Sequence, residues 1–169
     1  MAVVNVKSTA VTNADATTQT LNKKGLTNGV LKVARGTVET TNGDSIGSVY
    51  RFCRLPSRAR IINIQLWSDD IGTTTIADFG IYDTAANGGA VVDADAFGSA
   101  VSLKDGAVAG TMIHHESAVY GVEDIEQQLW EIAAASTDPN KDYDIAATLT
   151  AAADAAGTIS LLVFYTDGD

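Results

Sequence analysis

The sequence has few of the residues that cross-link or stiffen a chain. Its 169 residues include one cysteine, Cys53, which excludes an internal disulfide and a zinc cluster of several cysteines. Two prolines and fifteen glycines are too few for a proline-rich or collagen-like chain. The composition, 46% hydrophobic and 19% charged, is that of a globular protein. A domain of this length buries enough surface to fold without cross-links.

Long hydrophobic runs are also missing. No stretch approaches the roughly 18 apolar residues that suggest a membrane-spanning helix. The N-terminal residues are mostly polar and lack the apolar segment typical of a signal peptide. We therefore expect no membrane partner, and we expect synthesis and folding in a cytoplasm.

Positive charge is scarce over most of the chain. Residues 61–169 hold two Lys and Arg against eighteen acidic residues, whereas residues 1–60 hold nine against three, and the net charge is −10. Because an acidic body repels phosphate backbones, direct nucleic-acid binding is not expected. A basic first third suits docking onto an acidic protein surface, including a second copy of the chain. Ordinary solvated surface charge is the other interpretation.

The first 28 residues differ in composition from the rest. They are rich in Thr, Asn, Ala, Ser and Lys, and they contain too few apolar residues to build a core. Because Thr and Val favour extended backbone, we predict an extended N-terminal arm over 1–28 that can add to a sheet edge. A single domain over 29–169 follows it.

Within this domain, β-branched and apolar residues form runs that are separated by turn residues. They predict strands over residues 30–40, 46–55, 60–67, 74–82, 143–150 and 158–166. Alternation in 60–67 places Ile62, Ile64 and Leu66 on one face of a strand and Trp67 on the other. The small residues of 90–110 predict a loop with short strands.

One segment predicts a helix. In residues 119–135, Val122, Ile125, Leu129 and Ile132 recur at intervals of three, four and three, which places them on one helical face. We therefore predict a mainly β protein. Its fold is an antiparallel β-sandwich, jelly-roll-like, with an extended N-terminal arm and one short helix.

Residues 43–45, Gly-Asp-Ser, resemble the nucleophile segment of serine hydrolases. The glycine that should follow Ser45 is replaced by Ile46, and neither His114 nor His115 has an aspartate three residues before it. A serine without a base is a weak nucleophile, so we interpret the segment as a hairpin turn and predict no enzyme. A hydrolase acting through Ser45 is the alternative.

The two histidines also suggest a metal site, together with Glu116. Because adjacent strand residues point to opposite faces, one ion is rarely held by both His114 and His115. We expect no cofactor and no metal there. Cys53 lies between Phe52 and Arg54 in a predicted strand, where we expect a buried packing role.

Residues 93–98 imitate the start of an EF-hand loop. Phe97 and Lys104 occupy two of its ligand positions, so this segment is not an EF-hand. Calcium binding by Asp93 and Asp95 stays open.

The arrangement resembles small virion proteins of tailed bacteriophages, in particular capsid decoration or cement proteins. The features that carry the resemblance are the polar arm, residues 55–62 entering a strand, the strand and turn over 78–83, and the closing hairpin from 143 to 165. The resemblance implies a sandwich on the capsid exterior, made in the host cytoplasm. It also implies a trimer or dimer that stabilises the assembled capsid by bridging major capsid proteins.

The expected partners are therefore the major capsid protein and copies of the chain itself. The expected partner-binding residues belong to the arm and the basic first third: Val3, Val4, Val6, Lys7, Lys23, Lys24, Arg58 and Arg60. One alternative is another virion component, such as a tail, neck or head-fibre protein. A second is a carbohydrate-binding jelly roll that uses Trp67, Tyr82 and the acidic loop at 83–95.

Overall fold

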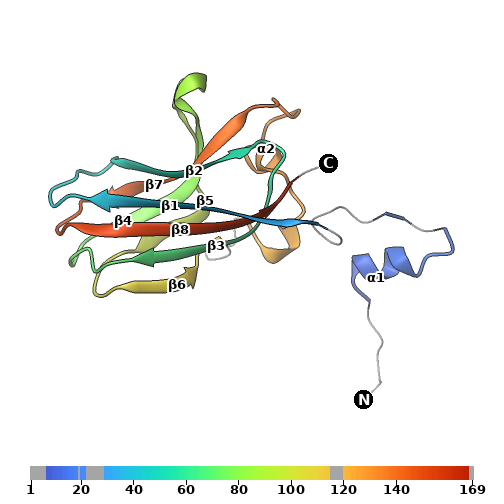
Figure 1. Cartoon of the computed structure of the whole chain (residues 1–169), viewed down its shortest axis with the longest axis horizontal. Coiled ribbons are helices and arrows are strands. Elements are labelled where there is room, and N and C mark those ends of the chain that lie inside the picture. The colour runs from blue at the N-terminus through green and yellow to red at the C-terminus, as the bar shows by residue number, and fades with distance from the viewer. Residues whose placement is uncertain (1–6, 19, 22–28, 115–119, 168–169) are drawn as a thin grey trace, which may run out of the picture.

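The body of the protein consists of two four-stranded sheets packed face to face (Figure 1). The structure is a computed structural model that describes residues 7–18, 20–21, 29–114 and 120–167. Its strands are β1 (Leu31–Thr40), β2 (Val49–Pro56), β3 (Arg60–Ser68), β4 (Ile76–Asp83), β5 (Val91–Ser102), β6 (Val108–Met112), β7 (Asp142–Ala151) and β8 (Gly157–Thr166). All strand pairs are antiparallel, which confirms the predicted β-sandwich.

The strand order is that of a jelly roll. One sheet, here called the first sheet, runs β1-β8-β3-β6, and the second runs β2-β7-β4-β5. Strand β1 therefore pairs with β8, β2 with β7, β3 with β6 and β4 with β5. These are the pairs of one long hairpin, β1–β4 against β5–β8, that has been wound into two layers. The winding adds the β3–β8 and β4–β7 pairs, and the result is a double-sheet jelly roll.

The core fills the space between the two sheets. Alternation places Ala77, Phe79 and Ile81 of β4 inward, and each of these side chains is fully buried. Phe52 stacks on Phe79 with ring centroids 6.3 Å apart. The two sheets approach closely where β1 crosses β2, because a Cβ on Gly36 would lie 2.0 Å from the backbone oxygen of Phe52. A glycine is required at that crossing.

In β3 the predicted alternation fails at one position. Ile61, Ile64 and Leu66 are fully buried, whereas Ile62 is partly exposed. The register against β8 shifts between Ile61 and Asn63, so one extra residue reverses the alternation at this point. The prediction for Ile62 was therefore wrong, and those for Ile64 and Leu66 are confirmed.

The segment 90–110, expected to be a loop with short strands, contains the 12-residue strand β5 and the start of the short strand β6. Gly80 of β4 allows β5 to approach closely, because a Cβ on Gly80 would lie 2.0 Å from the backbone oxygen of Asp93. Three register shifts interrupt the β4–β5 pairing. Because of these shifts, apolar and polar residues do not alternate regularly in β5, so the sequence pattern did not predict a strand there.

The helix predicted over 119–135 is wrong as a continuous element. Residues 115–119 lie outside the described residues, and the rest forms a 3₁₀ turn, η2 (Val122–Asp124), and one turn of α-helix, α2 (Leu129–Ile132). Between them Gln128 is extended. The amides of Leu129 and Trp130 donate to the carbonyls of Ala59 and Ser57, so the β2–β3 turn holds α2 in place. No helix in the described part of the chain is long and apolar enough to cross a membrane.

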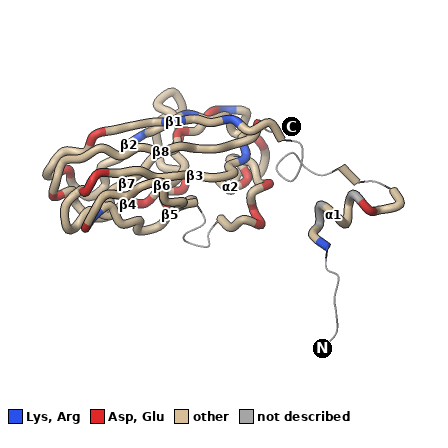
Figure 2. The backbone as a smooth tube through the Cα atoms, turned by 60° about the horizontal axis from the view of Figure 1, so that its bottom comes forward, with Lys and Arg blue, Asp and Glu red and all other residues tan. Residues whose placement is uncertain are grey.

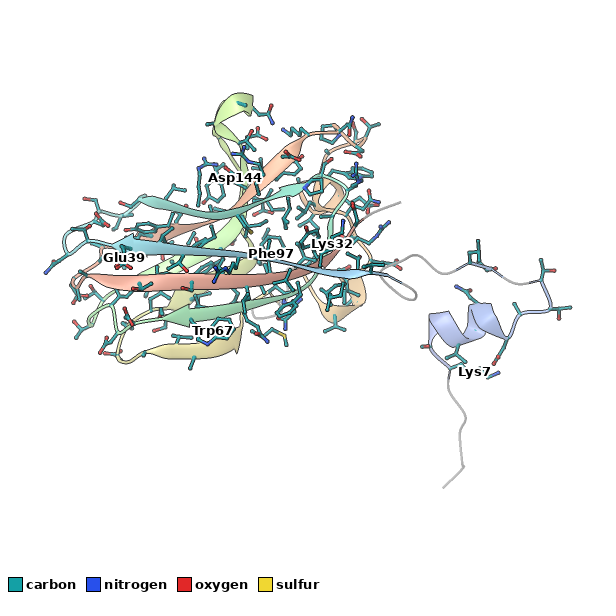
Figure 3. The ribbon with its side chains drawn as sticks, viewed as in Figure 1. Lys7, Lys32, Glu39, Trp67, Phe97 and Asp144 are labelled. Carbon is teal, nitrogen blue, oxygen red and sulfur yellow. The ribbon has the colours of Figure 1, made fainter. Side chains whose placement is uncertain are left out.

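The N-terminal segment is not wholly extended. A six-residue helix, α1 (Thr9–Ala14), begins after Ser8, whose side chain accepts a hydrogen bond from the amide of Val11. Lys7 and Asp15 form an ion pair of 2.7 Å across this helix. Figures 1 and 3 place α1 beyond the end of the sandwich at which β1 begins. The predicted extended conformation is wrong for residues 9–14.

Candidate functional site

The start of the first strand and the finish of the last strand lie side by side at one end of the sandwich. Strand β1 starts there and β8 ends there, because the two strands pair antiparallel from Leu31 opposite Thr166. Asp167 accepts hydrogen bonds from Lys32 at 2.8 Å and from Arg58 at 2.9 Å. These bonds hold the pKa of Asp167 below its ordinary value. We call Lys32, Arg58 and Asp167 the arm-end cluster, because the arm enters the sandwich beside them.

The structure separates the residues expected to bind a partner. Lys7 lies in the arm beside α1, and Arg58 lies in the arm-end cluster with 47% of its side chain exposed. Arg60, in contrast, is only 4% exposed, and its Nε donates to the carbonyl of Glu126. It holds the segment before α2 and offers no surface to a partner. Val3, Val4, Val6, Lys23 and Lys24 lie outside the described residues.

A second charged cluster surrounds Asp144 on the outer side of the second sheet. Its carboxylate accepts hydrogen bonds from Arg51 at 2.9 Å and from Arg54 at 2.8 Å. Burial raises the pKa of Asp144, but the hydrogen bonds and charges of Arg54 and Arg51 outweigh burial and lower it. Arg51 also donates to the carbonyls of Asp83 and Gly89, which fastens the β4–β5 loop to β2.

These two clusters involve four of the nine basic residues of positions 1–60. Arginines and lysines of the first third pair with Asp144 and Asp167 of the last third. Figure 2 accordingly shows basic and acidic residues interspersed over the sandwich. For these basic residues, ordinary surface pairing is the better interpretation. Sequence reasoning missed both acidic residues, since their partners lie 90 to 135 residues away and no local pattern marks them.

The residues considered for hydrolysis do not form a nucleophile and base. Ser45 is exposed in the turn between β1 and β2, where Gly43 adopts a φ of 94°. His114 is fully buried, and its Nδ1 accepts a hydrogen bond from the amide of Ile64. The predicted turn is confirmed, but it is not a hairpin, because β1 and β2 belong to different sheets and do not pair with each other. The Ser45 hydrolase has no base in His114. His115 and Glu116 lie outside the described residues.

Cys53 packs against the core as expected, although it is not fully buried. Burial, with a smaller contribution from the charge of Asp144, raises the pKa of its thiol to about 12. The thiol is therefore protonated at neutral pH and is a poor nucleophile.

The carboxylates considered for calcium lie in strand β5. Burial raises the pKa of Asp93, and its carboxylate accepts a hydrogen bond from the amide of Asp95. Within the described residues no group of three or more His, Cys, Asp and Glu side chains is arranged to hold a metal ion.

The carbohydrate site considered as an alternative, which would use both Trp67 and Tyr82, is not assembled. Trp67 projects from the outer face of the first sheet, whereas Tyr82 lies on the outer side of the second sheet, where Arg51 packs over its ring. The core of the sandwich separates the two rings. A single site that uses both aromatic side chains is therefore excluded.

Two solved structures share this fold. A chain of the structure described as "Cyanophage Pam1 capsid asymmetric unit" is similar over 98% of this chain and 99% of its own length, with a TM-score of 0.51 and 18% sequence identity. A chain of "Capsid of Ralstonia phage GP4" is similar over 83% of this chain and 86% of its own, with a TM-score of 0.57 and 19% identity. No protein-family model and no curated protein matches the sequence.

Proposed function

We propose that the protein is a structural component of a bacteriophage virion that binds the assembled capsid and stabilises it by bridging major capsid proteins. The observation that carries the proposal is the shared fold, which extends over nearly the whole of a similar chain in a phage capsid. A protein that binds only the assembled lattice stabilises that lattice by mass action. The net charge of −10 keeps such a protein soluble and away from nucleic acid.

The arm is the contact to the capsid in this proposal. An isolated helix of six residues is not stable in water, so α1 needs a partner surface to stay folded. Leu21 is 95% exposed and Val11 46% exposed, and both offer apolar side chains to such a surface. The arm-end cluster, with Arg58, forms the rim of the same contact. A dimer or trimer on the capsid exterior would present several arms to adjacent major capsid proteins.

Co-sedimentation with phage heads that lack the protein tests this function. The full chain is expected to bind the heads in hundreds of copies, whereas a chain without residues 2–27 folds but does not bind. Replacing Val11 and Leu21 by Asp should weaken binding at least about tenfold, which corresponds to about 1.4 kcal/mol. Asp at Thr17 and Thr20, exposed polar positions of the same segment, is the matched control and should leave binding unchanged.

Binding by the truncated chain would overturn the role of the arm. A full chain that stays in the supernatant would overturn the capsid role itself. A copy number of about a dozen or fewer would instead favour the tail, neck or head-fibre alternative.

A further inference from the structure

The outer face of the first sheet carries a polar row that crosses three strands. Trp67 of β3 lies opposite Ser160 of β8, and Ser160 lies opposite Thr37 of β1. The hydroxyls of Thr37 and Ser160 are 2.9 Å apart. Glu39 and Arg35 flank Thr37 along the same face of β1, at i+2 and i−2. An aromatic ring, hydroxyls and charges of both signs thus occur together on an exposed face.

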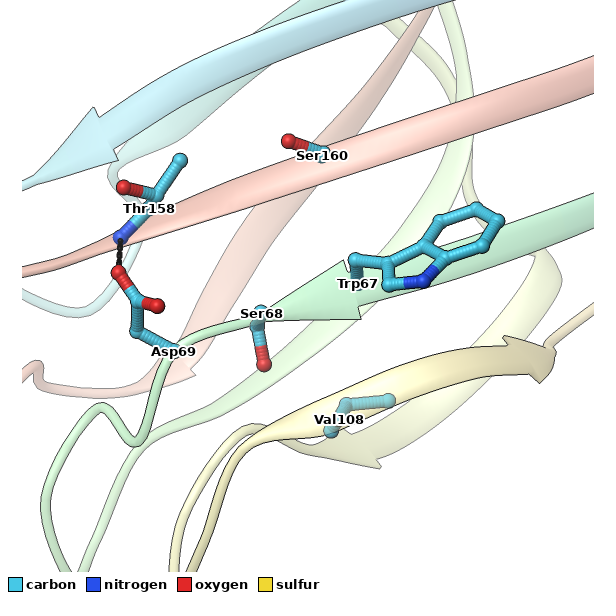
Figure 4. Close-up of a pocket in the computed structure, with 6 residues that line it drawn as sticks. All are labelled: Trp67, Ser68, Asp69, Val108, Thr158 and Ser160. Carbon is cyan, nitrogen blue, oxygen red and sulfur yellow. Dashed lines mark hydrogen bonds between the residues drawn. The ribbon is translucent and has the colours of Figure 1, made fainter.

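Two hollows meet at Trp67. One, of about 240 Å³, is lined by Trp67, Ser68, Asp69, Val108, Thr158 and Ser160 (Figure 4). The other, of about 210 Å³, is lined by Arg35, Gly36, Thr37, Trp67, Ser160, Leu161 and Leu162. Since both share Trp67 and Ser160, they form one trough with the indole at its middle. Together they reach the lower part of the ~300–1,000 Å³ range of small-ligand sites.

The indole is held in place by the backbone of β6. Gly110 has a φ of 69°, and a Cβ there would lie 3.2 Å from Cζ2 of Trp67. A side chain at position 110 would therefore crowd the ring. The Nε1–H of Trp67 donates no hydrogen bond to any residue that the structure describes, which leaves it available to a ligand. The ring is positioned before any ligand arrives, so little conformational entropy is lost on binding.

The polar groups of the trough are also held in fixed positions. Thr158 donates its hydroxyl to Glu39 at 2.8 Å, and its amide donates to Asp69 at 2.9 Å, as the dashed line in Figure 4 shows. The carboxylates keep further lone pairs that can accept hydrogen bonds. Arg35 forms no ion pair with the described residues, so its guanidinium can donate. Sugar hydroxyls are both donors and acceptors, and the trough offers both.

We propose that this trough binds a neutral oligosaccharide of pyranose sugars, with one ring stacked on Trp67 and its neighbours in the two hollows. The apolar C–H face of a pyranose fits the electron-rich face of an indole. Glu39, Asp69, Ser160 and Arg35 would bind the hydroxyls at the ring edges. A neutral sugar is favoured over an acidic one because the net charge of −10 repels polyanions. This site is distinct from the arm, so it goes beyond the proposed capsid function.

The test measures sugar binding by the full chain. An array of neutral glycans identifies candidates, and calorimetry with maltohexaose, cellohexaose and chitohexaose measures affinity. At least one neutral oligosaccharide should bind, and Trp67→Ala should weaken binding at least about tenfold. Met112→Ala is the matched control, since Met112 is an exposed apolar residue of β6 that lines neither hollow. It should change affinity less than about twofold.

A second variant keeps the test valid if the Trp67→Ala chain does not fold. Arg35→Ala changes an exposed side chain and should weaken binding about threefold or more while the far-ultraviolet circular dichroism stays unchanged. In a Trp130→Phe chain, Trp67 is the remaining tryptophan, and its fluorescence should shift when sugar binds.

Three results would overturn the glycan site. The first is no binding of any neutral glycan up to about 10 mM. The second is binding that a folded Trp67→Ala chain retains, and the third is binding of oligogalacturonate alone. If the natural chain binds no sugar and Trp67→Ala also loses capsid co-sedimentation, this face is a protein interface instead. Retained co-sedimentation with lost sugar binding would support the glycan site and leave the capsid role intact.

Discussion

At the scale of single residues, Asp144 shows how one carboxylate can organise basic residues from a distant part of the chain. It is only 5% exposed, yet it is ionised because Arg51 and Arg54 donate to both of its oxygens. Arg51 then reaches the carbonyls of Asp83 and Gly89, so one carboxylate organises strands β2 and β7 and the β4–β5 loop. A buried charge with two partners is costly to remove.

We predict that Asp144→Asn lowers the free energy of unfolding by about 1–3 kcal/mol at pH 7. The folded state lowers the pKa of Asp144, so the unfolded chain takes up the proton at a higher pH. The stabilisation is therefore complete above the ordinary pKa of about 3.9 and is lost as pH falls through the folded value. Urea unfolding of both chains at several pH values should show that their difference narrows in acid.

The exposed Asp142 of the same strand provides the control for this prediction. Asp142→Asn should change the free energy of unfolding by less than about 0.5 kcal/mol. A difference between Asp144→Asn and the natural sequence that stays constant down to pH 2 would contradict the role assigned to Asp144.

At the scale of elements, the segment between β6 and β7 shows how tertiary hydrogen bonds override a helical pattern. Four apolar residues have the spacing of one helical face, but only Leu129 among them is fully buried, and Val122 is 63% exposed. The carbonyls of Ser57 and Ala59 take the amides of Trp130 and Leu129. The first amides of α2 therefore bond to carbonyls of the β2–β3 turn and not to a preceding helical turn. For this reason the chain is extended at Gln128 and does not continue as a helix.

The two ends of that segment should respond differently to truncation. We predict that Leu129→Ala lowers the free energy of unfolding by about 2–5 kcal/mol, the usual cost of emptying a buried leucine site. Val122→Ala should cost less than about 0.5 kcal/mol. Thermal and urea unfolding measure both. Equal losses would mean that the four apolar residues share one buried face, as in a continuous helix.

At the scale of the whole molecule, the jelly-roll order makes most strand pairing non-local. β1 pairs with β8 across more than a hundred residues, and β2 with β7 across almost as many. The entropy of closing such long loops is lost before the contacts form, which slows folding. We predict refolding in the range of milliseconds to seconds, measured by stopped-flow tryptophan fluorescence. Complete refolding within about 100 μs would contradict this order of events.

Much of this fold could be predicted from local patterns. The strands β1, β3, β4, β7 and β8 were predicted close to their observed bounds, because β-branched and apolar residues alternate there and turn residues separate them. The turn before Ser45 and the outward direction of Trp67 were predicted for the same reason, but the hairpin expected across that turn was wrong, because β1 and β2 belong to different sheets. Three features were not predicted. A bulge in β3 turns Ile62 outward, and a close approach at Gly80 accompanies the irregular pairing of β5. Hydrogen bonds from the β2–β3 turn interrupt the predicted helix.

The candidate sites divide in the same way. Composition separates an arm from a body, and the presence of Trp67 suggests a sugar site without saying where its partners are. The other residues that line the hollows at the ring include Ser160 of β8, which lies beside β3, and Arg35 of β1, which lies on the other side of β8. Only the jelly roll brings these three strands into one sheet. Arg60 was expected to bind a partner because it belongs to the basic first third, but its side chain is buried in the fold.

The amino-acid order by itself determined the class of this protein, an acidic β-sandwich preceded by a polar arm. The alternation of apolar residues and the residue types of turns depend on neighbours in the chain, so they can be recognised from the sequence alone. Only the tertiary structure decided which strands share a sheet, which acids neutralise the basic third, and which groups surround Trp67. Those contacts join residues far apart along the chain, and they form because two apolar sheet faces must be buried against each other.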